Sequence, residues 1–291
     1  MKDRPTLYLA GDSTVQSYPP EKNPMTGWGQ MLWTFFKEKD RCRSYVRPDA
    51  PGSHCVTYEM PSFSIENHAF AARSSRSFIE QGRLEEIMKV ARPGDYLALQ
   101  FAHNDAYKER EERYVPVEKF GEWLKKYKDA CDERGMTCIF VTPVTMRVFD
   151  GDRCRMVFSE YRDEMLKTAD ILGVPRVDLS LKSTELITKL GFTKARDVYL
   201  WLYPGEYPES DFKDGATDNA HFQRYGASLM ASLVAEGLKE IKGFEALSPL
   251  KAAIADDLTV PGFNRIYPEG FKWQEDEDML ANAGREIVKR E

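Results

Sequence analysis

The chain has 291 residues, of which 42% are hydrophobic and 30% are charged, and its net charge is −6 at neutral pH. This length and composition are typical of a globular protein with one large α/β domain or two small ones. The acidic balance argues against a nucleic-acid-binding surface. No stretch approaches the roughly 20 apolar residues that span a bilayer, so we expect neither nucleic acid nor membrane as a partner.

The N-terminal residues and the cysteines indicate in which cellular compartment the protein is expected. The first residues lead directly into an apolar segment without a signal-like region, which favours a cytoplasmic protein; a secreted protein whose signal was removed is the alternative. The five cysteines are odd in number and lack C-x-x-C spacing, so we expect reduced thiols. A bridge between Cys42 and Cys55 is the alternative.

The first strong element is a short apolar strand over residues 6–9, between Pro5 and Gly11. A turn follows with Asp12, Ser13 and Thr14, and its serine can present a hydroxyl and a backbone N–H at the carboxyl edge of a sheet. Apolar side chains at helical spacing then predict a helix from about 26 to the charged run at 37–40. Residues 41–61 hold prolines and no clear period, so we expect an irregular segment.

Strands and helices alternate along the middle of the chain. Strands are predicted at 62–69, 96–101, 137–142 and 176–179, and helices at 78–88, 116–134 and 157–172. Five strands with intervening helices predict a doubly wound parallel sheet in a three-layer α/β/α sandwich. In the flavodoxin-like order, the first strand lies between the second and the third.

The last third of the chain begins with a predicted long loop at 192–217, rich in Tyr, Trp, Pro, Gly and Asp. Asp218, Asn219, Ala220 and His221 are predicted to open a final helix at 222–241. We therefore expect a domain over residues 1–243. The extension at 244–291 is predicted to pack on that domain or on a second subunit, which leaves a homo-oligomer open.

The turns after the first three strands should line one pocket, and they carry Ser13, Ala72 and Asn104. The D-x-x-H of Asp218 and His221 lies within one helical turn, which can bring a carboxylate close to an imidazole. Acyl transfer from serine needs a base, a group that orients it, and donors for the oxyanion. These residues would supply His221 as the base, Asp218 as its partner, and the hole from the N–H groups of Ser13 and Ala72 and the amide of Asn104.

Several separated blocks share an order that resembles the SGNH (GDSL-type) hydrolases, and among them the rhamnogalacturonan acetylesterase-like group. The blocks are AGDST, GWGQML, NHAFAARSSRSF, PGDYLALQFAHND, VTPV and DNAHFQRYGA. The resemblance implies the SGNH hydrolase fold, Ser13 as nucleophile, His221 as general base and then acid, and Asp218 as its orienting carboxylate. It also implies an oxyanion hole from Ser13, Ala72 and Asn104.

Two positions depart from the family pattern. Ala72 stands where a glycine usually precedes the arginine, and Ala102 replaces the glycine of Gly-His-Asn-Asp. Ala72 keeps the N–H that an oxyanion hole requires, and its methyl group would narrow the acyl pocket, which suits acetyl. The same changes are compatible with another substrate or with an inactive relative.

Other polar and aromatic residues have two interpretations each. Arg73 and His103 can brace loops or contact substrate, with Arg73 or Arg76 near a uronate carboxylate in the second case. Trp201 can pack in the core or stack on a sugar. We find no ligand spacing for a metal around His54 or His68.

The resemblance thus implies a serine esterase that removes acetyl groups from a carbohydrate, with rhamnogalacturonan (pectin) oligosaccharides as the expected substrate. No cofactor is expected. Two alternatives remain: an acetylesterase of other acylated sugars such as xylan fragments, and a non-catalytic carbohydrate-binding relative.

Overall fold

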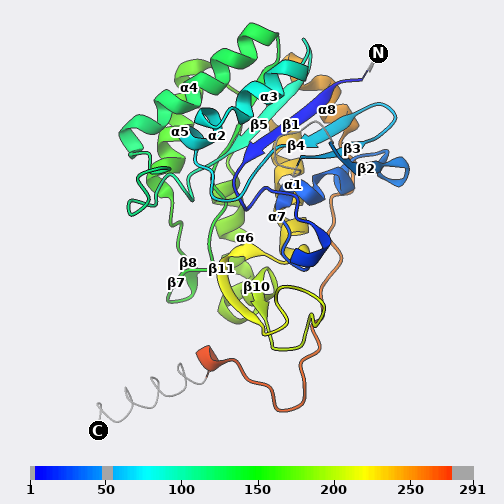
Figure 1. Cartoon of the computed structure of the whole chain (residues 1–291), viewed down its shortest axis with the longest axis vertical. Coiled ribbons are helices and arrows are strands. Elements are labelled where there is room, and N and C mark those ends of the chain that lie inside the picture. The colour runs from blue at the N-terminus through cyan, green and yellow to red at the C-terminus, as the bar shows by residue number, and fades with distance from the viewer. Residues whose placement is uncertain (1–3, 48–54, 277–291) are drawn as a thin grey trace. The chain divides into compact units, whose positions relative to one another are not determined.

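The computed structural model describes residues 4–47 and 55–276. The chain divides between Pro261 and Gly262 into two compact units, which we describe separately. The first unit contains every strand and all eight labelled α-helices of the described residues (Figure 1).

A seven-stranded sheet forms the centre of the first unit, with the strand order β2-β3-β4-β1-β5-β6-β9. Its parallel part comprises β4 (Ser64–Asn67), β1 (Thr6–Gly11), β5 (Tyr96–Gln100), β6 (Thr137–Val141) and β9 (Arg176–Val177). In chain order these five strands lie as second, first, third, fourth and fifth. The predicted five parallel strands and their flavodoxin-like order are confirmed.

Two further strands extend the sheet at the edge beyond β4. They are β2 (Arg43–Val46) and β3 (Val56–Glu59), and both pairings are antiparallel. The prediction of an irregular segment at 41–61 was therefore wrong for these residues. All four residues of β2 are exposed, so this edge strand carries no buried apolar alternation that a sequence pattern could reveal.

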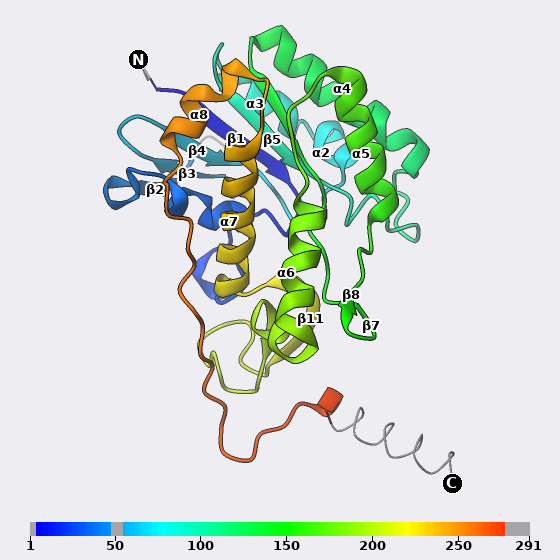
Figure 2. The same cartoon turned by 180° about the vertical axis from the view of Figure 1, so that it is seen from behind.

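Helices cover both faces of the sheet (Figures 1 and 2). One face packs against α2 (Ser75–Glu80), α3 (Arg83–Val90), α4 (Val117–Arg134) and α5 (Ser159–Leu172), which share a buried core with side chains of β1, β5 and β6. The other face carries α1 (Trp28–Met31), α6 (Leu179–Lys194) and α7 (Arg224–Glu240), with α6 and α7 in contact. The predicted three-layer α/β/α architecture is confirmed.

Helix ends follow from glycine at two clear positions. The α4 and α5 helices end at Gly135 (φ 67°) and Gly173 (φ 61°), both left-handed. The predicted helix over 78–88 is split into α2 and α3 at Gly82, and the helix predicted from 26 continues after α1 only as a 3-10 turn, Leu32–Phe35. The remaining 3-10 turns are Pro20–Lys22, Lys39–Arg41, Ala195–Asp197 and Glu245–Leu247.

The region between β9 and α7 differs most from the prediction. No helix is predicted where α6 lies, and the loop predicted at 192–217 contains the strand β10 (Tyr199–Leu202). This strand pairs antiparallel with β11 (Ala216–Phe222). Asp218 and His221 thus lie on a strand, and α7 begins only at Arg224. A two-stranded ribbon, β7 (Phe149–Asp150) with β8 (Arg153–Cys154), precedes α5.

The chain beyond residue 243 divides between the two units. Helix α8 (Ser248–Ala253) and the residues after it return to the first unit, where Ala255 N–H donates to Phe35 O at 2.8 Å and Ile254 bridges Phe36. This part of the predicted extension packs on the domain. The second unit contains an aromatic group in which Phe271 and Tyr267 stack and Trp273 meets both edge-on.

All five cysteines are free thiols, so Cys42 and Cys55 form no bridge. None of the helices in the described residues combines the length and the apolar character that crossing a membrane requires.

Candidate active site

The turn after β1 is held by its own aspartate. The Oδ1 atom of buried Asp12 accepts hydrogen bonds from the backbone N–H of Thr14 at 2.9 Å and from its hydroxyl at 2.8 Å. A Cβ on Gly11 would lie 2.6 Å from Val15 and 2.9 Å from the carbonyl oxygen of Gln100, so the close approach of this turn to β5 requires glycine. Ser13 is consequently fixed at the carboxyl edge of the sheet.

A buried hydrogen-bond chain supports the turn from behind. The Gln100 amide donates to Thr14 Oγ1 at 2.7 Å, and its oxygen accepts from Trp28 Nε1 at 2.9 Å. Trp28 is 1% exposed and therefore packs in the core. Gln100 could not be predicted as a support of this turn, because no sequence pattern indicates the partners of a polar residue at the end of an apolar strand.

Ser13, His221 and Asp218 form a continuous hydrogen-bonded chain. The Ser13 hydroxyl lies 2.9 Å from His221 Nε2, and His221 Nδ1 lies 2.7 Å from Asp218 Oδ2. With Nδ1 protonated, the ring donates to the carboxylate and Nε2 accepts from the serine hydroxyl. The side chains of His221 and Asp218 are about one-third exposed, so the chain ends at an accessible surface. The predicted proximity of hydroxyl, imidazole and carboxylate is present.

A bulge in β11 places the carboxylate and the imidazole together. Tyr199 of β10 pairs with Phe222, and the next residue, Leu200, pairs with Asp218, so three residues of β11 loop out of the ladder. Within this loop the Oδ1 atom of Asp218 accepts from the N–H groups of Ala220 at 2.7 Å and His221 at 3.0 Å. The predicted helix entry was wrong, and the bulge takes its place.

The bulge is also anchored through Asn219. Its Oδ1 atom accepts from Trp201 Nε1 at 2.9 Å and from Arg147 Nη1 at 3.2 Å, and Arg147 N–H donates to its carbonyl at 2.8 Å. Arg147 is buried and also lies over the Trp201 ring. Asn219 is predicted from sequence only as part of a helix entry and Arg147 not at all, because their hydrogen-bond partners are distant in sequence. Trp201 is 5% exposed, and this placement gives no support to the predicted stacking on a sugar.

Mutual interaction shifts the pKa values of Asp218 and His221 in opposite directions. Burial raises the pKa of Asp218, but the hydrogen bond and charge of His221 and two backbone donors outweigh it and lower the pKa to about 2. Burial lowers the pKa of His221, but the hydrogen bond and charge of Asp218, with the charge of Asp12, raise it above 6.5 overall. The carboxylate is therefore charged at neutral pH, and its charge and hydrogen bond make the imidazole a stronger base than an isolated histidine.

His103 lies beside the serine turn. Its Nδ1 is 3.5 Å from Asp12 Oδ2, and its ring packs 4.5 Å from that of Phe158. Burial raises the pKa of Asp12, but His103 and the hydrogen bonds from Thr14 lower it overall. The placement matches the bracing interpretation of His103, and its contact with substrate stays a prediction.

The predicted oxyanion donors lie on adjacent strand ends. The loop after β4 runs beside the serine turn, because Phe70 N–H donates to Gly11 O at 3.0 Å and Ala71 N–H to Gln16 Oε1 at 2.5 Å. Over the described residues, the backbone N–H groups of Ser13 and Ala72 have no hydrogen-bond acceptor. Two donors are thus free on neighbouring loops.

The two alanines that replace family glycines keep a glycine-like backbone. Ala72 has φ 63° and Ala102 has φ 133°, and they are the non-glycine residues with positive φ in the described chain. Asn104 lies two residues after Ala102, and its amide donates to Arg73 O at 3.0 Å. Asn104 therefore links the third strand end to the Ala72 loop and keeps a second amide hydrogen.

Arg73 is engaged by its own loop. Its Nη1 donates to Ala71 O at 2.8 Å and its Nε to Gln81 Oε1 at 2.8 Å, and it lies over the Phe70 ring. These contacts match the bracing interpretation, and contact with substrate stays a prediction.

Asp105, the residue after Asn104, is hydrogen-bonded to Ser75 at the start of α2. Fully buried, it accepts from the N–H and hydroxyl of Ser75 at 3.0 and 2.5 Å. Burial, with a contribution from the charge of Asp12, raises the pKa of Asp105 to about 7 despite those bonds.

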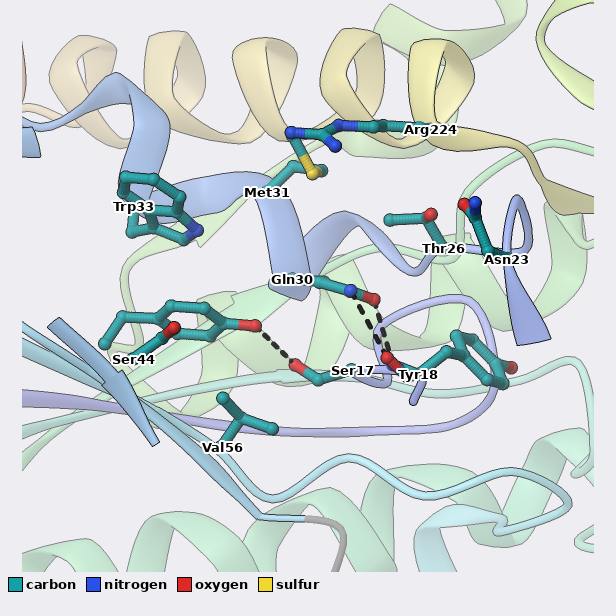
Figure 3. A pocket seen from close by; sticks show the side chains of 11 residues that line it. Ser17, Tyr18, Asn23, Thr26, Gln30, Met31, Trp33, Ser44, Val56 and Arg224 are labelled. Carbon is teal, nitrogen blue, oxygen red and sulfur yellow. Dashed lines mark hydrogen bonds between the residues drawn. The ribbon is translucent and has the colours of Figure 1, made fainter. Parts of the chain in front are cut away.

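A recess of about 290 Å³ lies next to the serine turn (Figure 3). Tyr18 connects the two, because it lines the recess and its hydroxyl donates to Ser13 O at 2.8 Å. The other lining residues are mostly polar or aromatic: Ser17, Asn23, Thr26, Gln30, Met31, Trp33, Ser44, Val56, Tyr58 and Arg224.

One group of side chains could bring metal-ligating atoms together. Cys55, Glu66 and His68 are buried and place one ligand atom each within 4.8 Å of the others. Arg47 Nη1 already pairs with Glu66 Oε2 at 3.0 Å, which places a positive charge where a cation would bind. His54, the other histidine for which the sequence shows no ligand spacing, lies outside the described residues.

Comparison with known proteins places the chain among esterases. No protein-family model matches it. It is 35% identical over 242 residues to the rhamnogalacturonan acetylesterase RhgT of Bacillus subtilis (strain 168), covering 83% of this chain and 92% of that protein. It is also 35% identical over 236 residues to the probable rhamnogalacturonan acetylesterase YesY of the same organism, covering 81% and 93%.

Solved structures share the fold. The crystal structure of YxiM from Bacillus subtilis superposes with a TM-score of 0.64 at 26% identity, over 83% of this chain and 58% of that chain. The acetylxylan esterase Axe2 from Geobacillus stearothermophilus gives a TM-score of 0.54 at 15% identity, over 84% and 98%.

Proposed function

The chain belongs to the rhamnogalacturonan acetylesterase-like group of the SGNH (GDSL-type) hydrolases, and on that premise we propose that it removes O-acetyl groups from rhamnogalacturonan oligosaccharides. The observation that carries the proposal is the chain from Ser13 Oγ through His221 to Asp218, with links of 2.9 and 2.7 Å. A nucleophile, its base and an orienting carboxylate within hydrogen-bond reach are what acyl transfer requires.

Acylation begins with Ser13 as the nucleophile. Its Oγ forms a bond to the ester carbonyl carbon while its proton passes to His221 Nε2. Asp218 stays ionised, holds the Nδ1–H tautomer and stabilises the imidazolium that forms. The negatively charged carbonyl oxygen accepts hydrogen bonds from the free N–H groups of Ser13 and Ala72 and from the Asn104 amide.

Collapse of the tetrahedral intermediate releases the sugar. His221 returns its proton to the leaving sugar oxygen, and the acetyl group stays on Ser13 as an ester. Water then loses a proton to His221 and attacks the acetyl carbonyl carbon. The serine oxygen leaves, recovers the proton from His221, and acetic acid is released. None of these steps calls on a group beyond the residues named and water.

The positive φ of Ala72 supports an active enzyme over a non-catalytic relative. An alanine there keeps the conformation that glycine adopts without strain, so the N–H of this loop has not been turned away by the substitution. A binding protein without a reaction would have no need of the strained geometry.

The test is acetate release from defined acetylated oligosaccharides of rhamnogalacturonan and of xylan, with Ser13→Ala as the control. We expect release from the first set, loss of release in the variant, and labelling of Ser13 by an active-serine phosphonate. Equal rates on both sets would contradict the pectic substrate. Absence of labelling and of 4-nitrophenyl acetate hydrolysis would contradict the esterase itself.

A further inference from the structure

The loop that carries Ala72 is fixed at the residue before it. Ala72 has φ 63°, and an L-residue keeps a positive φ only where the surrounding structure determines the backbone. The Ala71 N–H donates to Gln16 Oε1 at 2.5 Å, which ties the loop to the serine turn, because Gln16 N–H itself donates to Asp12 O at 3.1 Å. The Ala71 carbonyl accepts from Arg73 Nη1 at 2.8 Å. Both main-chain polar groups of Ala71 are therefore hydrogen-bonded.

The contact of Arg73 with this loop acts on the peptide group of a predicted oxyanion donor. The Ala71 carbonyl and the Ala72 N–H belong to the same peptide group, and this N–H has no acceptor in residues 4–47 and 55–276. A hydrogen bond to the oxygen of an amide polarises the group and strengthens its N–H as a donor. A charged donor makes that bond about twice as strong as a neutral one does. Arg73 thus fixes this peptide group and increases the positive partial charge on its N–H.

Arg73 is connected to a second predicted donor through its main chain. Its carbonyl oxygen accepts from the Asn104 amide at 3.0 Å, and the other hydrogen of that amide is the one expected to reach the oxyanion. The side chain of Arg73 therefore contacts the peptide group of Ala72, and its main chain contacts Asn104. No other residue in the described part of the chain is hydrogen-bonded to both of these groups.

The charge of Arg73 is not neutralised by an acidic partner. Among the described residues no carboxylate forms an ion pair with it. Its remaining contacts are neutral, because Nε donates to Gln81 Oε1 at 2.8 Å and the guanidinium lies 4.2 Å from the centre of the Phe70 ring. Burial and the charge of Arg113 lower the pKa of Arg73, but a guanidinium stays protonated in proteins. A positive charge beside the predicted oxyanion hole stabilises the negative charge that develops there.

The neighbouring arginines lack this arrangement. Arg83, the first residue of α3, lies 4.0 Å from the centre of the same Phe70 ring, and its side chain has no hydrogen bond within the described ranges. Arg76 lies 3.6 Å from Glu80, which pairs with its charge. Neither of them contacts the Ala71 carbonyl, so Arg83 provides a matched control with the same charge over the same ring.

We propose that Arg73 is a positioning residue of the oxyanion hole, whose guanidinium holds and polarises the Ala71–Ala72 peptide group so that its N–H stabilises the tetrahedral intermediate. The proposal rests on the proposed function, because it assigns a supporting residue to the same reaction. It also accounts for an alanine at a position of positive φ, since the bond to the Ala71 carbonyl fixes a backbone that alanine alone does not favour. In this role the guanidinium itself does not touch the substrate.

The test uses 4-nitrophenyl acetate, an ester with neither a sugar nor a carboxylate, so that a loss of rate cannot come from a lost contact with the carbohydrate. Removal of an oxyanion donor costs about 10²–10³-fold in kcat. Arg73→Gln weakens one donor without removing it, so we expect a loss of about ten- to hundredfold. Both kcat and kcat/KM should fall together, because the contact acts in the transition state. Arg73→Lys should restore part of the rate, since it keeps a charged donor.

The control variant is Arg83→Gln, which removes the same charge from the same ring and should leave both constants unchanged. Urea unfolding of each variant should confirm that it is folded. A readout without turnover is the amide resonance of Ala72 in the NMR spectrum of alanine-labelled protein. We expect Arg73→Gln to shift this resonance, because it removes the hydrogen bond on the same peptide group, and Arg83→Gln to leave it in place.

Three results would overturn the proposal: an unchanged kcat in Arg73→Gln, equal losses in both glutamine variants, or a resonance of Ala72 that Arg73→Gln does not move. A loss confined to KM would also contradict it, because it would place Arg73 in substrate binding. Absence of hydrolysis in the wild type would instead overturn the proposed function, and the resonance of Ala72 would still decide whether Arg73 holds the peptide group.

Discussion

The left-handed backbone of Ala72 leads to a prediction about stability. Ala72 has φ 63° and is exposed, so its methyl group contributes little buried area. An L-residue in this region costs about 1–2 kcal/mol relative to glycine, because Cβ crowds the following carbonyl oxygen. Ala72→Gly should remove this strain.

Glycine also has a cost of its own. Its greater freedom in the unfolded chain destabilises the folded state by about 0.5–1 kcal/mol relative to alanine. The net effect of Ala72→Gly should therefore be stabilising, by about 1 kcal/mol or less. Ala102 is a poorer test, because its methyl is fully buried and its loss would offset the relief of strain.

The matched control is Ala71→Gly, the same chemical change one residue earlier, where φ is not positive. It should lose stability by about 0.5–1 kcal/mol, so the two variants should differ by about 1–2 kcal/mol. Urea unfolding followed by circular dichroism measures both, provided that the m-values agree. Equal losses in the two variants would refute the reasoning, because the backbone of Ala72 would then carry no strain.

Three further predictions concern the site. Asn104→Ala should lower kcat on 4-nitrophenyl acetate about a hundredfold or more with folding retained, and an unchanged rate would remove Asn104 from the oxyanion hole. Activity should rise with pH as His221 loses its proton, at a pKa raised above 6.5 by Asp218. Asp218→Asn should lower kcat by up to about 10⁴-fold, and the rise of activity with pH should occur at lower pH because the pKa of His221 falls. A rise at the same pH as in the wild type would argue against the pairing of Asp218 with His221. The pKa of Asp105 is raised from 3.8 to about 7, so its stabilising contribution is complete below pH 3.8 and is lost as pH rises through 7. The unfolding free energy of Asp105→Asn should depend less on pH between 5 and 8, and parallel curves would exclude Asp105 as the source.

The parallel core could be predicted because each of its strands has its own signal. The strand β5 is buried along its whole length, and α4 carries apolar residues at helical spacing up to a glycine stop. The edge strands could not be predicted, because β2 is exposed on every residue and its identity depends on pairing with β3. A short exposed strand is specified by its neighbour more than by its own sequence.

The same distinction explains the site. Ser13 and Asn104 could be placed because they follow strongly predicted strands. The recess could not, because it is assembled from α1, the edge strands and the start of α7, and none of these is contiguous in sequence. Arg224 lines this recess, and no sequence pattern connects it with the site except its position three residues after His221.

The D-x-x-H spacing correctly predicted that Asp218 and His221 lie together, but the helix entry predicted for them was wrong, because they lie on β11. Asp218 Oδ1 accepts from the N–H groups two and three residues later, which are the bonds that a helix-capping aspartate makes to N2 and N3. The spacing thus specifies a local turn around a carboxylate, whether a helix or a strand bulge follows. Because that turn alone presents the second carboxylate oxygen to the imidazole, the partnership of Asp218 with His221 could be predicted where the surrounding hairpin could not.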